Sequence, residues 1–228
     1  MSNGVLVKLV NVTKHLWGYP VLAGINLEAL VGNFIAVINP GGNYMLSKTV
    51  LLEIMAGLLR ADGGSVMILG VDLMREFNKA VKLRRRDLAI VFRDPGITLI
   101  MTLTNLENIM LPLLQLGMKK DEAKAIALSI AKNLGLSEEI LYKSTGKTDT
   151  NQRRIVAIAR ALALKPKVLI IDEPTISRNK EASETILINL RKFADDNKAT
   201  VIVAHDKTAL PYADKQYILA NGKLMTVP

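Results

Sequence analysis

The sequence predicts an α/β fold whose mainly parallel sheet is interrupted by a helical insertion. Short apolar runs bounded by turn residues recur along the 228-residue chain, and helix-like stretches separate several of them. Strands joined through helices form parallel pairs, because the chain must return to the same end of the sheet before the next strand begins. The composition agrees, since 50% of the residues are hydrophobic but only 4% are aromatic, as expected for a sheet buried on both faces by aliphatic side chains.

The predicted elements follow from these runs. Strands are expected at 5–10, 34–38, 66–69, 88–92, 168–171, 200–204 and 216–219. Helices are expected at 48–59, 151–164 and 181–197, where apolar residues recur at helical spacing. The segment 97–148 has almost no strand signal, and it contains an amphipathic stretch at 121–134 and a shorter one at 137–142. We therefore predict a helical subdomain at 97–148, inserted into a core formed by residues 1–96 and 149–228.

Composition and charge exclude several classes of function. The chain has no cysteine, which removes disulfides and thiol chemistry, and its apolar stretch 97–118 contains Glu107 and Pro112, which are costly inside lipid. We expect neither a membrane span nor a signal peptide, which fits a cytosolic protein. The net charge is +9, with a basic run at 82–86. Because no aromatic residues interleave with these charges, we interpret the run as a solvated helix end and expect no nucleic-acid partner.

The first candidate site is a glycine-containing loop between a predicted strand and a predicted helix. Gly42 and Lys48 have the spacing of the phosphate-binding pattern G-x-x-x-x-G-K-[ST], although Ser47 stands at the second glycine. In such a loop backbone N–H groups face phosphate oxygens, Lys48 supplies a positive charge and the Thr49 hydroxyl reaches Mg²⁺. Taken alone, the segment fits an ordinary strand–turn–helix connection equally well. The candidate nucleotide contacts are Asn39, Gly41, Gly42, Ser47, Lys48 and Thr49.

Two further polar groups follow buried strands. The apolar run 168–171 leads directly to Asp172 and Glu173, and the run 200–204 leads to His205. The carboxyl ends of parallel strands form the ligand-binding edge of open α/β sheets. Asp172 there can hold Mg²⁺ and Glu173 can orient or deprotonate a water molecule. The alternatives are an acidic turn that caps the next helix and a histidine with a purely structural hydrogen bond.

The order of these segments resembles the ATP-binding subunits of ABC transporters over nearly the whole chain. The resemblance rests on the run LLEIMAGLLR at 51–60 and on RRIVAIARAL at 153–162. It also rests on residues 84–92 followed by 103–114, which are similar to the branch that serves lipoprotein release and macrolide export. It implies a RecA-like P-loop core with a mainly parallel sheet, an antiparallel β portion and an inserted helical subdomain. It also implies ATP and Mg²⁺ as cofactors, a membrane permease and a second ATP-binding cassette as partners, and a peripheral position on the inner face of the cell membrane.

The departures from the family pattern lie where the family contacts nucleotide. Either three residues are inserted in the phosphate loop before Lys48, or the link from the strand to the loop is three residues longer. Arg93 replaces a glutamine that touches Mg²⁺, and Arg178-Asn179 replaces the usual Leu-Asp. The adenine-stacking aromatic corresponds to Trp17, with Tyr19 as the alternative. The signature L-S-G-G-Q, which meets the γ-phosphate of the opposite subunit, corresponds to Thr148 followed by Asp149, Thr150, Asn151 and Gln152.

The resemblance implies a role for each retained residue. Lys48 binds the β- and γ-phosphates, Thr49 and Asp172 hold Mg²⁺, Glu173 activates water and His205 stabilises the γ-phosphate. The expected function is that of an ATP-binding subunit that couples ATP binding and hydrolysis to a permease, with weak or partner-dependent ATP hydrolysis. Two alternatives stay open: a pseudo-ATPase that is the structural partner of an active cassette, and a cassette protein acting on nucleic acid.

Overall fold

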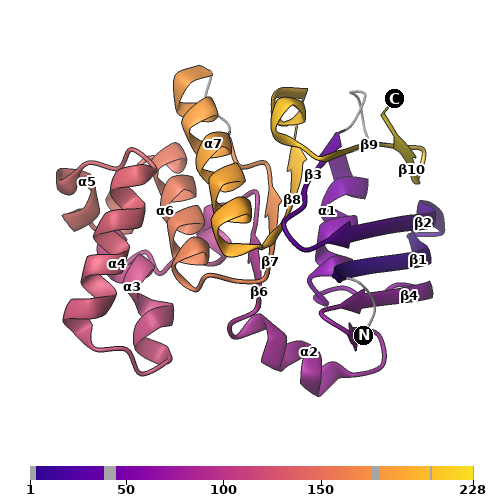
Figure 1. Cartoon of the computed structure of the whole chain (residues 1–228), viewed down its shortest axis with the longest axis horizontal. Helices are drawn as coiled ribbons and strands as arrows, with labels where there is room; N and C mark the ends of the chain where they lie inside the picture. The colour runs from indigo at the N-terminus through magenta and orange to yellow at the C-terminus, as the bar shows by residue number, and fades with distance from the viewer. Residues whose placement is uncertain (1–3, 39–44, 176–179, 206, 228) are drawn as a thin grey trace.

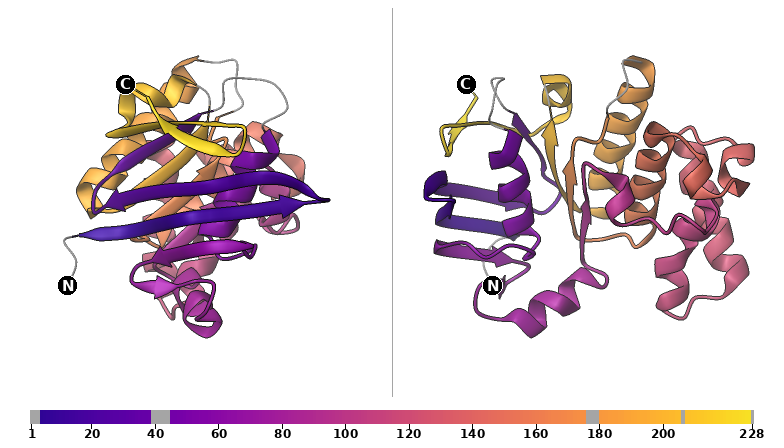
Figure 2. Two further views of the ribbon diagram at one scale, coloured as in Figure 1. Left: turned by 90° about the vertical axis from the view of Figure 1, so that its right-hand side faces the viewer. Right: turned by 180° about the vertical axis from the view of Figure 1, so that it is seen from behind.

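Three groups of elements lie side by side in the protein. The computed structural model describes residues 4–38, 45–175, 180–205 and 207–227. An antiparallel sheet lies at one end, a mainly parallel sheet at the centre and a group of helices at the other end (Figure 1). The view from behind shows the same order, with the antiparallel strands and the far helices separated by the central sheet (Figure 2).

The central sheet has six strands in the order β10-β9-β3-β8-β7-β6. All neighbours among β9, β3, β8, β7 and β6 are parallel, and β10 alone pairs antiparallel, with β9. The register places Ile38 opposite His205 and Asp172 opposite Ala204, so β3, β8 and β7 end at one edge. The strands are β3 (Phe34–Ile38), β6 (Leu88–Val91), β7 (Val168–Asp172), β8 (Thr200–His205), β9 (Lys215–Ala220) and β10 (Lys223–Thr226).

The second sheet is antiparallel, in the order β2-β1-β4-β5. Its strands are β1 (Val5–Leu16), β2 (Tyr19–Leu30), β4 (Gly63–Ile68) and β5 (Val71–Asp72). The prediction for β1 stopped at residue 10, and β2 was not predicted. Register shifts interrupt the alternation of buried side chains in β1, and β2 contains Pro20 and Gly24, residues that weaken a strand pattern.

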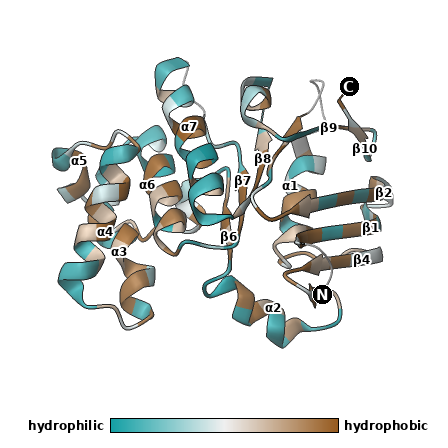
Figure 3. Ribbon diagram, viewed as in Figure 1, coloured by the Kyte–Doolittle hydropathy of each residue, from teal (hydrophilic) through white to brown (hydrophobic). Residues whose placement is uncertain are grey.

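Two hydrophobic cores lie on opposite faces of the central sheet because successive side chains of a strand point in opposite directions. Phe34 and Ala36 of β3 pack with helices α6 (Thr150–Ala163) and α7 (Lys180–Asn197). Ile35 of the same strand packs on the other side. There the helix α1 (Met45–Met55) fills the space between the two sheets, as its contacts with β2, β4, β7 and β8 confirm. The hydropathy colouring shows the central strands β6 and β7 mostly brown and α7 striped with teal and brown (Figure 3).

The helix α1 ends four residues earlier than the sequence indicated. Gly57 has φ +66° and its N–H donates to the carbonyl of Ile54, while the N–H of Leu58 donates to the carbonyl of Glu53. These two bonds form a Schellman motif, in which a glycine in the left-handed conformation ends the helix. The apolar spacing continues past Gly57, which explains why the expected helix ran to residue 59.

Helices occupy the segment for which no strand was expected. These are α3 (Asn105–Gln115), α4 (Lys120–Asn133) and α5 (Glu138–Tyr142), and α3 and α4 both contact α6. The helix α2 (Phe77–Arg84) was not predicted as a separate element; the basic run 82–86 begins in it, and Arg85 and Arg86 are exposed. Among the helices of the described residues, none is long and apolar enough to cross a membrane.

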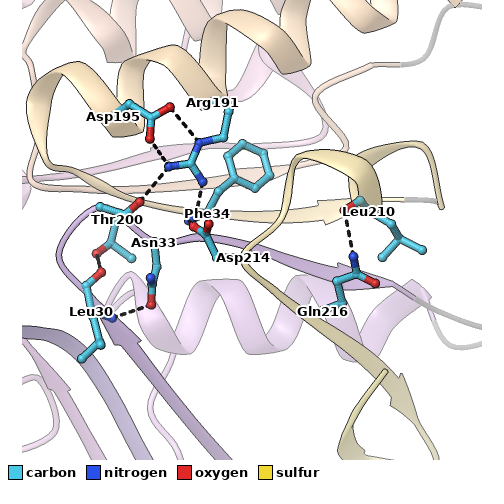
Figure 4. A network of polar contacts seen from close by, with 10 residues as sticks. Leu30, Asn33, Phe34, Arg191, Asp195, Thr200, Leu210, Asp214 and Gln216 are labelled. Atoms are coloured by element: carbon cyan, nitrogen blue, oxygen red, sulfur yellow. Dashed lines mark hydrogen bonds and ion pairs between the residues drawn. The ribbon is translucent and has the colours of Figure 1, made fainter. Parts of the chain in front are cut away.

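A polar network joins α7 to the central sheet at the edge away from the candidate site (Figure 4). The guanidinium of Arg191 donates to Asp195, to Asp214 at 2.7 Å and to the carbonyl of Gly32 at 3.0 Å. Its carbon Cζ lies 5.8 Å from the ring centre of Phe34, a distance typical of a cation–π contact. One arginine therefore fixes three chain segments that are far apart in sequence.

Candidate functional site

The carboxyl ends of β7 and β8 and the first turns of α1 bring five predicted site residues together. Asp172 is the last residue of β7 and His205 the last of β8, and they are only 4% and 2% exposed. Lys48 and Thr49 lie near the start of α1, and Lys48 is 5% exposed. Glu173 follows Asp172 directly. The parallel register and the helix that follows β3 thus produce a compact charged cluster, which we call the edge cluster (Lys48, Thr49, Asp172, Glu173 and His205).

Each carboxylate of the edge cluster has its own partners. Lys48 Nζ lies 2.8 Å from Glu173 Oε1, and the other oxygen of Glu173 lies 3.2 Å from His205 Nδ1. The hydroxyl of Thr49 donates to Asp172 Oδ2 at 2.8 Å. Burial alone would raise the pKa of Glu173, but the hydrogen bonds from His205 and Lys48 outweigh it and lower that pKa to about 2. Glu173 is therefore ionised at neutral pH, and it is paired with the lysine that the sequence assigns to phosphate.

The histidine is oriented from both sides. Because an ionised carboxylate only accepts hydrogen bonds, the Nδ1 atom of His205 carries the proton that faces Glu173. In the neutral ring Nε2 is then an acceptor, and Thr175 Oγ1 lies 2.7 Å from it, in position to donate. Thr175 is 8% exposed and was not assigned a role from the sequence, although it directly follows the Asp-Glu-Pro run.

The donor set around Asp172 fits Mg²⁺. Mg²⁺ prefers oxygen ligands and is commonly held by one or two carboxylates together with water and substrate phosphates. The pKa of Asp172 is raised mainly by burial, and that of Glu53 on α1 is raised by burial and by the charge of Asp172. Two carboxyl groups whose negative charges interact, one of them bonded to the Thr49 hydroxyl, form an acidic site that a divalent cation would stabilise.

The backbone of Glu173 has an unusual conformation. Its φ is +53°, in the left-handed region that L-residues other than Asn and Asp seldom adopt. Its N–H donates to the carbonyl of Ala204 at 2.9 Å, and its carbonyl accepts from Nη1 of Arg154. The other nitrogen, Nη2, donates to the carbonyl of Arg93. From its sequence position Arg154 is predicted only as part of a helix, because neither of these partner carbonyls can be identified from sequence spacing.

The signature-like residues lie at the start of α6. Asp149 is the N-cap residue: its carboxylate accepts from the backbone N–H of Gln152 at 2.9 Å, and the Gln152 side chain accepts from the N–H of Asp149. This arrangement is a capping box. Thr150 and Asn151 form the exposed first turn. The sequence contains the pattern of an N-cap residue followed three positions later by Gln, so the capping role of Asp149 was detectable but was not inferred.

The remaining predicted contacts are spread out. Arg93 follows β6, with an exposed side chain, and Ser47 is buried in the first turn of α1. Trp17 lies 83% exposed in the two-residue turn between β1 and β2, where it and Gly18 both have positive φ. The predicted loop residues Asn39, Gly41 and Gly42 and the Arg178-Asn179 pair lie outside the described residues.

Comparison with known proteins decides the family. The family model described as ABC transporter matches residues 41–176 of this chain. The chain belongs to the ABC transporter ATP-binding family. It is 34% identical to the ABC transporter ATP-binding protein YxdL of Bacillus subtilis, over 98% of this chain and 86% of that protein. It is also 34% identical to the lipoprotein-releasing system ATP-binding protein LolD of Geobacter metallireducens, over 90% of this chain and 89% of that one.

Solved structures agree with this assignment. An ATP-binding cassette dimer in a post-hydrolysis state, bound to ADP and Pi, superposes with a TM-score of 0.86 over 96% of both chains at 30% identity. The predicted α/β fold class and the family resemblance are therefore confirmed. Some relatives are longer: the chain spans 57% of an uncharacterized ABC transporter ATP-binding protein of Mycobacterium tuberculosis, to which it is 31% identical.

Proposed function

We propose that this protein is the ATP-binding subunit of an ABC transporter and that it couples the binding and slow hydrolysis of ATP to a membrane permease. The observation that carries the proposal is the edge cluster, in which a lysine, a threonine, two carboxylates and a histidine meet at the carboxyl edge of a parallel sheet. This edge is where open α/β folds bind their ligands.

Within this proposal each residue of the edge cluster has one task. Lys48 binds the β- and γ-phosphates, and Thr49 and Asp172 hold Mg²⁺. The metal ion, when bound, neutralises charge on the phosphate oxygens. Glu173 accepts a hydrogen bond from the attacking water and orients it, and His205 donates a hydrogen bond to the γ-phosphate. The last role requires His205 to exchange a present partner, since its two nitrogens face Glu173 and Thr175.

Other contacts with the nucleotide are proposed from the resemblance. Trp17 is a candidate for stacking on adenine. Its φ of +50° costs about 1 kcal/mol or more, and because its ring is exposed, no packing within the chain offsets this cost. Asn39, Gly41, Gly42 and Ser47 are proposed to surround the phosphates.

Weak hydrolysis follows from the charges near the edge cluster. The positive charge of Arg93 acts to lower the pKa of Asp172, although burial has the stronger effect and raises that pKa. A guanidinium at this position repels Mg²⁺. At the other contact, Asp149 would place a carboxylate toward the phosphate of a second cassette. Phosphoryl transfer depends on positioning and electrostatics, so misplaced charges of this kind reduce the rate, as the loss of a single donor does by about 10²-fold.

A groove of about 310 Å³ offers a position for the permease. It lies between β6, α3 and α6. Its apolar lining residues include Ile90, Leu111, Pro112 and Ala161, and its polar lining residues include Gln115 and Arg84. An apolar segment of the permease with an acidic end fits this lining. We propose that the permease segment binds in this groove and holds the protein on the cytoplasmic face of the membrane. We also propose that residues 97–148 act as a helical subdomain beside a core of residues 1–96 and 149–228.

Calorimetric titration with millimolar Mg-ATP tests the proposal. We expect weak binding by the wild type, loss of binding in Lys48→Met, and unchanged binding in Lys180→Met, a lysine whose side chain is 87% exposed. Absence of heat in the wild type, together with no rise in melting temperature, would contradict ATP binding.

The second candidate function is that of a pseudo-ATPase that supports an active cassette. The observation that favours it is the pair of changes at Arg93 and Asp149, which place a positive charge near the proposed metal and a negative charge near the proposed phosphate. It predicts that steady-state phosphate release by the wild type equals that of Glu173→Gln, with both rates at the background level.

A further inference from the structure

Arg154 is the most buried cationic side chain near the edge cluster. It is 2% exposed, and burial lowers its pKa, an effect that the charge of Glu173 opposes. Its guanidinium donates through Nη1 to the carbonyl of Glu173 and through Nη2 to the carbonyl of Arg93. A buried cation that donates to two carbonyls in separate loops ties those loops together, and its removal would take this donor from both carbonyls.

The carbonyl that Arg154 binds belongs to the residue with the left-handed backbone. Glu173 is held at φ +53° between two bonds, one from its N–H to Ala204 and one from Arg154 to its carbonyl. Such a conformation persists only where surrounding contacts enforce it. The direction of the Glu173 carboxylate, and hence its distances to Lys48 and His205, depends on this backbone conformation.

The same arginine lies close to the signature-like start of α6. Asp149 is the N-cap residue of the helix and Arg154 follows five positions later, about 1.4 helical turns. The capping box makes this first turn rigid. A shift of the helix start therefore moves the guanidinium, and with it the carbonyl of Glu173.

We propose that Arg154 is a positioning residue that connects the start of α6 to the backbone of Glu173 and so sets the direction of the Glu173 carboxylate. The proposal rests on the proposed function, in which Glu173 orients the attacking water. It extends that function by naming a residue outside the edge cluster through which an event at the signature-like segment reaches the water-orienting group.

The chain provides a local probe that does not require activity. It contains two histidines, His205 in the edge cluster and His15 on β1, where His15 lies near Asp62. In nitrogen-15 spectra of the imidazoles, His205 reports the position of Glu173 and His15 serves as the internal reference. The variants are Arg154→Met, which removes both donated bonds at similar size, and Arg154→Lys, which can keep one.

A matched control lies next to it on the same helix. Arg153 also donates to two backbone carbonyls, those of Thr145 and Gly146, but neither belongs to the edge cluster. Arg153→Met therefore removes the same number of bonds from the same helix without touching Glu173. Melting temperatures of the three variants identify any that fail to fold. If Arg154→Met does not fold, Arg154→Lys is used in its place.

We expect the His205 resonances to shift in Arg154→Met and to shift less in Arg154→Lys, while the His15 resonances stay unchanged in both variants. In Arg153→Met we expect the resonances of both histidines to stay unchanged. For ATP hydrolysis we expect kcat to fall by about 10- to 100-fold in Arg154→Met, with KM within about twofold of the wild type. An unmoved His205 spectrum in a folded Arg154 variant overturns the proposal. Wild-type protein without ATP turnover would contradict the proposed hydrolysis instead, and the imidazole spectra would still decide on Arg154.

Discussion

Lys48 Nζ lies 2.8 Å from Oε1 of Glu173, so the proposed phosphate-binding lysine and the proposed water-orienting carboxylate are bound to each other. Their side chains are 6% and 20% exposed, so water screens the Coulomb attraction between the two charges less than it would on the surface. A nucleotide phosphate has to displace Glu173 from Lys48. Binding of ATP would then release the carboxylate at the moment when a water molecule is to be oriented.

This competition predicts the effect of Glu173→Gln on affinity. The amide retains the size of the side chain but loses the charge that holds Lys48, so Lys48 becomes available to phosphate. We expect the variant to bind Mg-ATP about tenfold more tightly, which corresponds to about 1.4 kcal/mol. Calorimetry of the two proteins measures the difference. Equal or weaker binding by the variant would show that the ion pair does not oppose the nucleotide.

Arg93→Gln tests whether the arginine limits metal binding. The substitution removes a positive charge that acts on Asp172 and leaves the backbone carbonyl that Arg154 binds. We expect Mg²⁺ to support ATP binding at a lower concentration, and phosphate release to rise by about tenfold or more over the wild type. If release stays at the level of Glu173→Gln while ATP still binds, the protein is a structural partner and the pseudo-ATPase candidate is favoured.

Asp149→Ser tests whether the carboxylate at the start of α6 prevents pairing of two copies. Serine is as good an N-cap as aspartate, so the stability of the helix should change by only a few tenths of a kcal/mol. In gel filtration with Mg-ATP we expect Glu173→Gln to elute as a monomer and the double variant Asp149→Ser, Glu173→Gln to form a dimer. An ATP-dependent homodimer of Glu173→Gln alone would show that Asp149 is compatible with pairing.

Arg191→Met tests the network that fixes α7 to the central sheet. The variant loses the bonds to Asp195, Asp214 and the Gly32 carbonyl, and we expect the free energy of unfolding to fall by about 2–3 kcal/mol. Urea unfolding measures the change. The control is Lys180→Met, which breaks the exposed 3.8 Å pair with Glu184 on the same helix and should cost less than about 0.5 kcal/mol. Equal effects of the two substitutions would contradict the structural role of Arg191.

The sequence by itself determined the parallel sheet and the residues at its edge. The apolar runs before Asp172 and His205 indicated buried strands, and parallel strands bring their carboxyl ends to one edge whatever the details of packing. The edge cluster was therefore predictable. The antiparallel strand β2 was not, because Pro20 and Gly24 weaken its pattern and its partner strand is irregular.

Only the tertiary structure decided which groups touch. Lys48 and Glu173 are 125 positions apart, and Arg154 is 61 positions from the Arg93 carbonyl that it binds. Spacing along the chain carries no information about such contacts, since they depend on how α1 and α6 pack on opposite faces of the sheet. The left-handed backbone of Glu173 has the same origin: a hydrogen bond donated to β8 and another accepted from α6 impose it on a residue whose own preference is different.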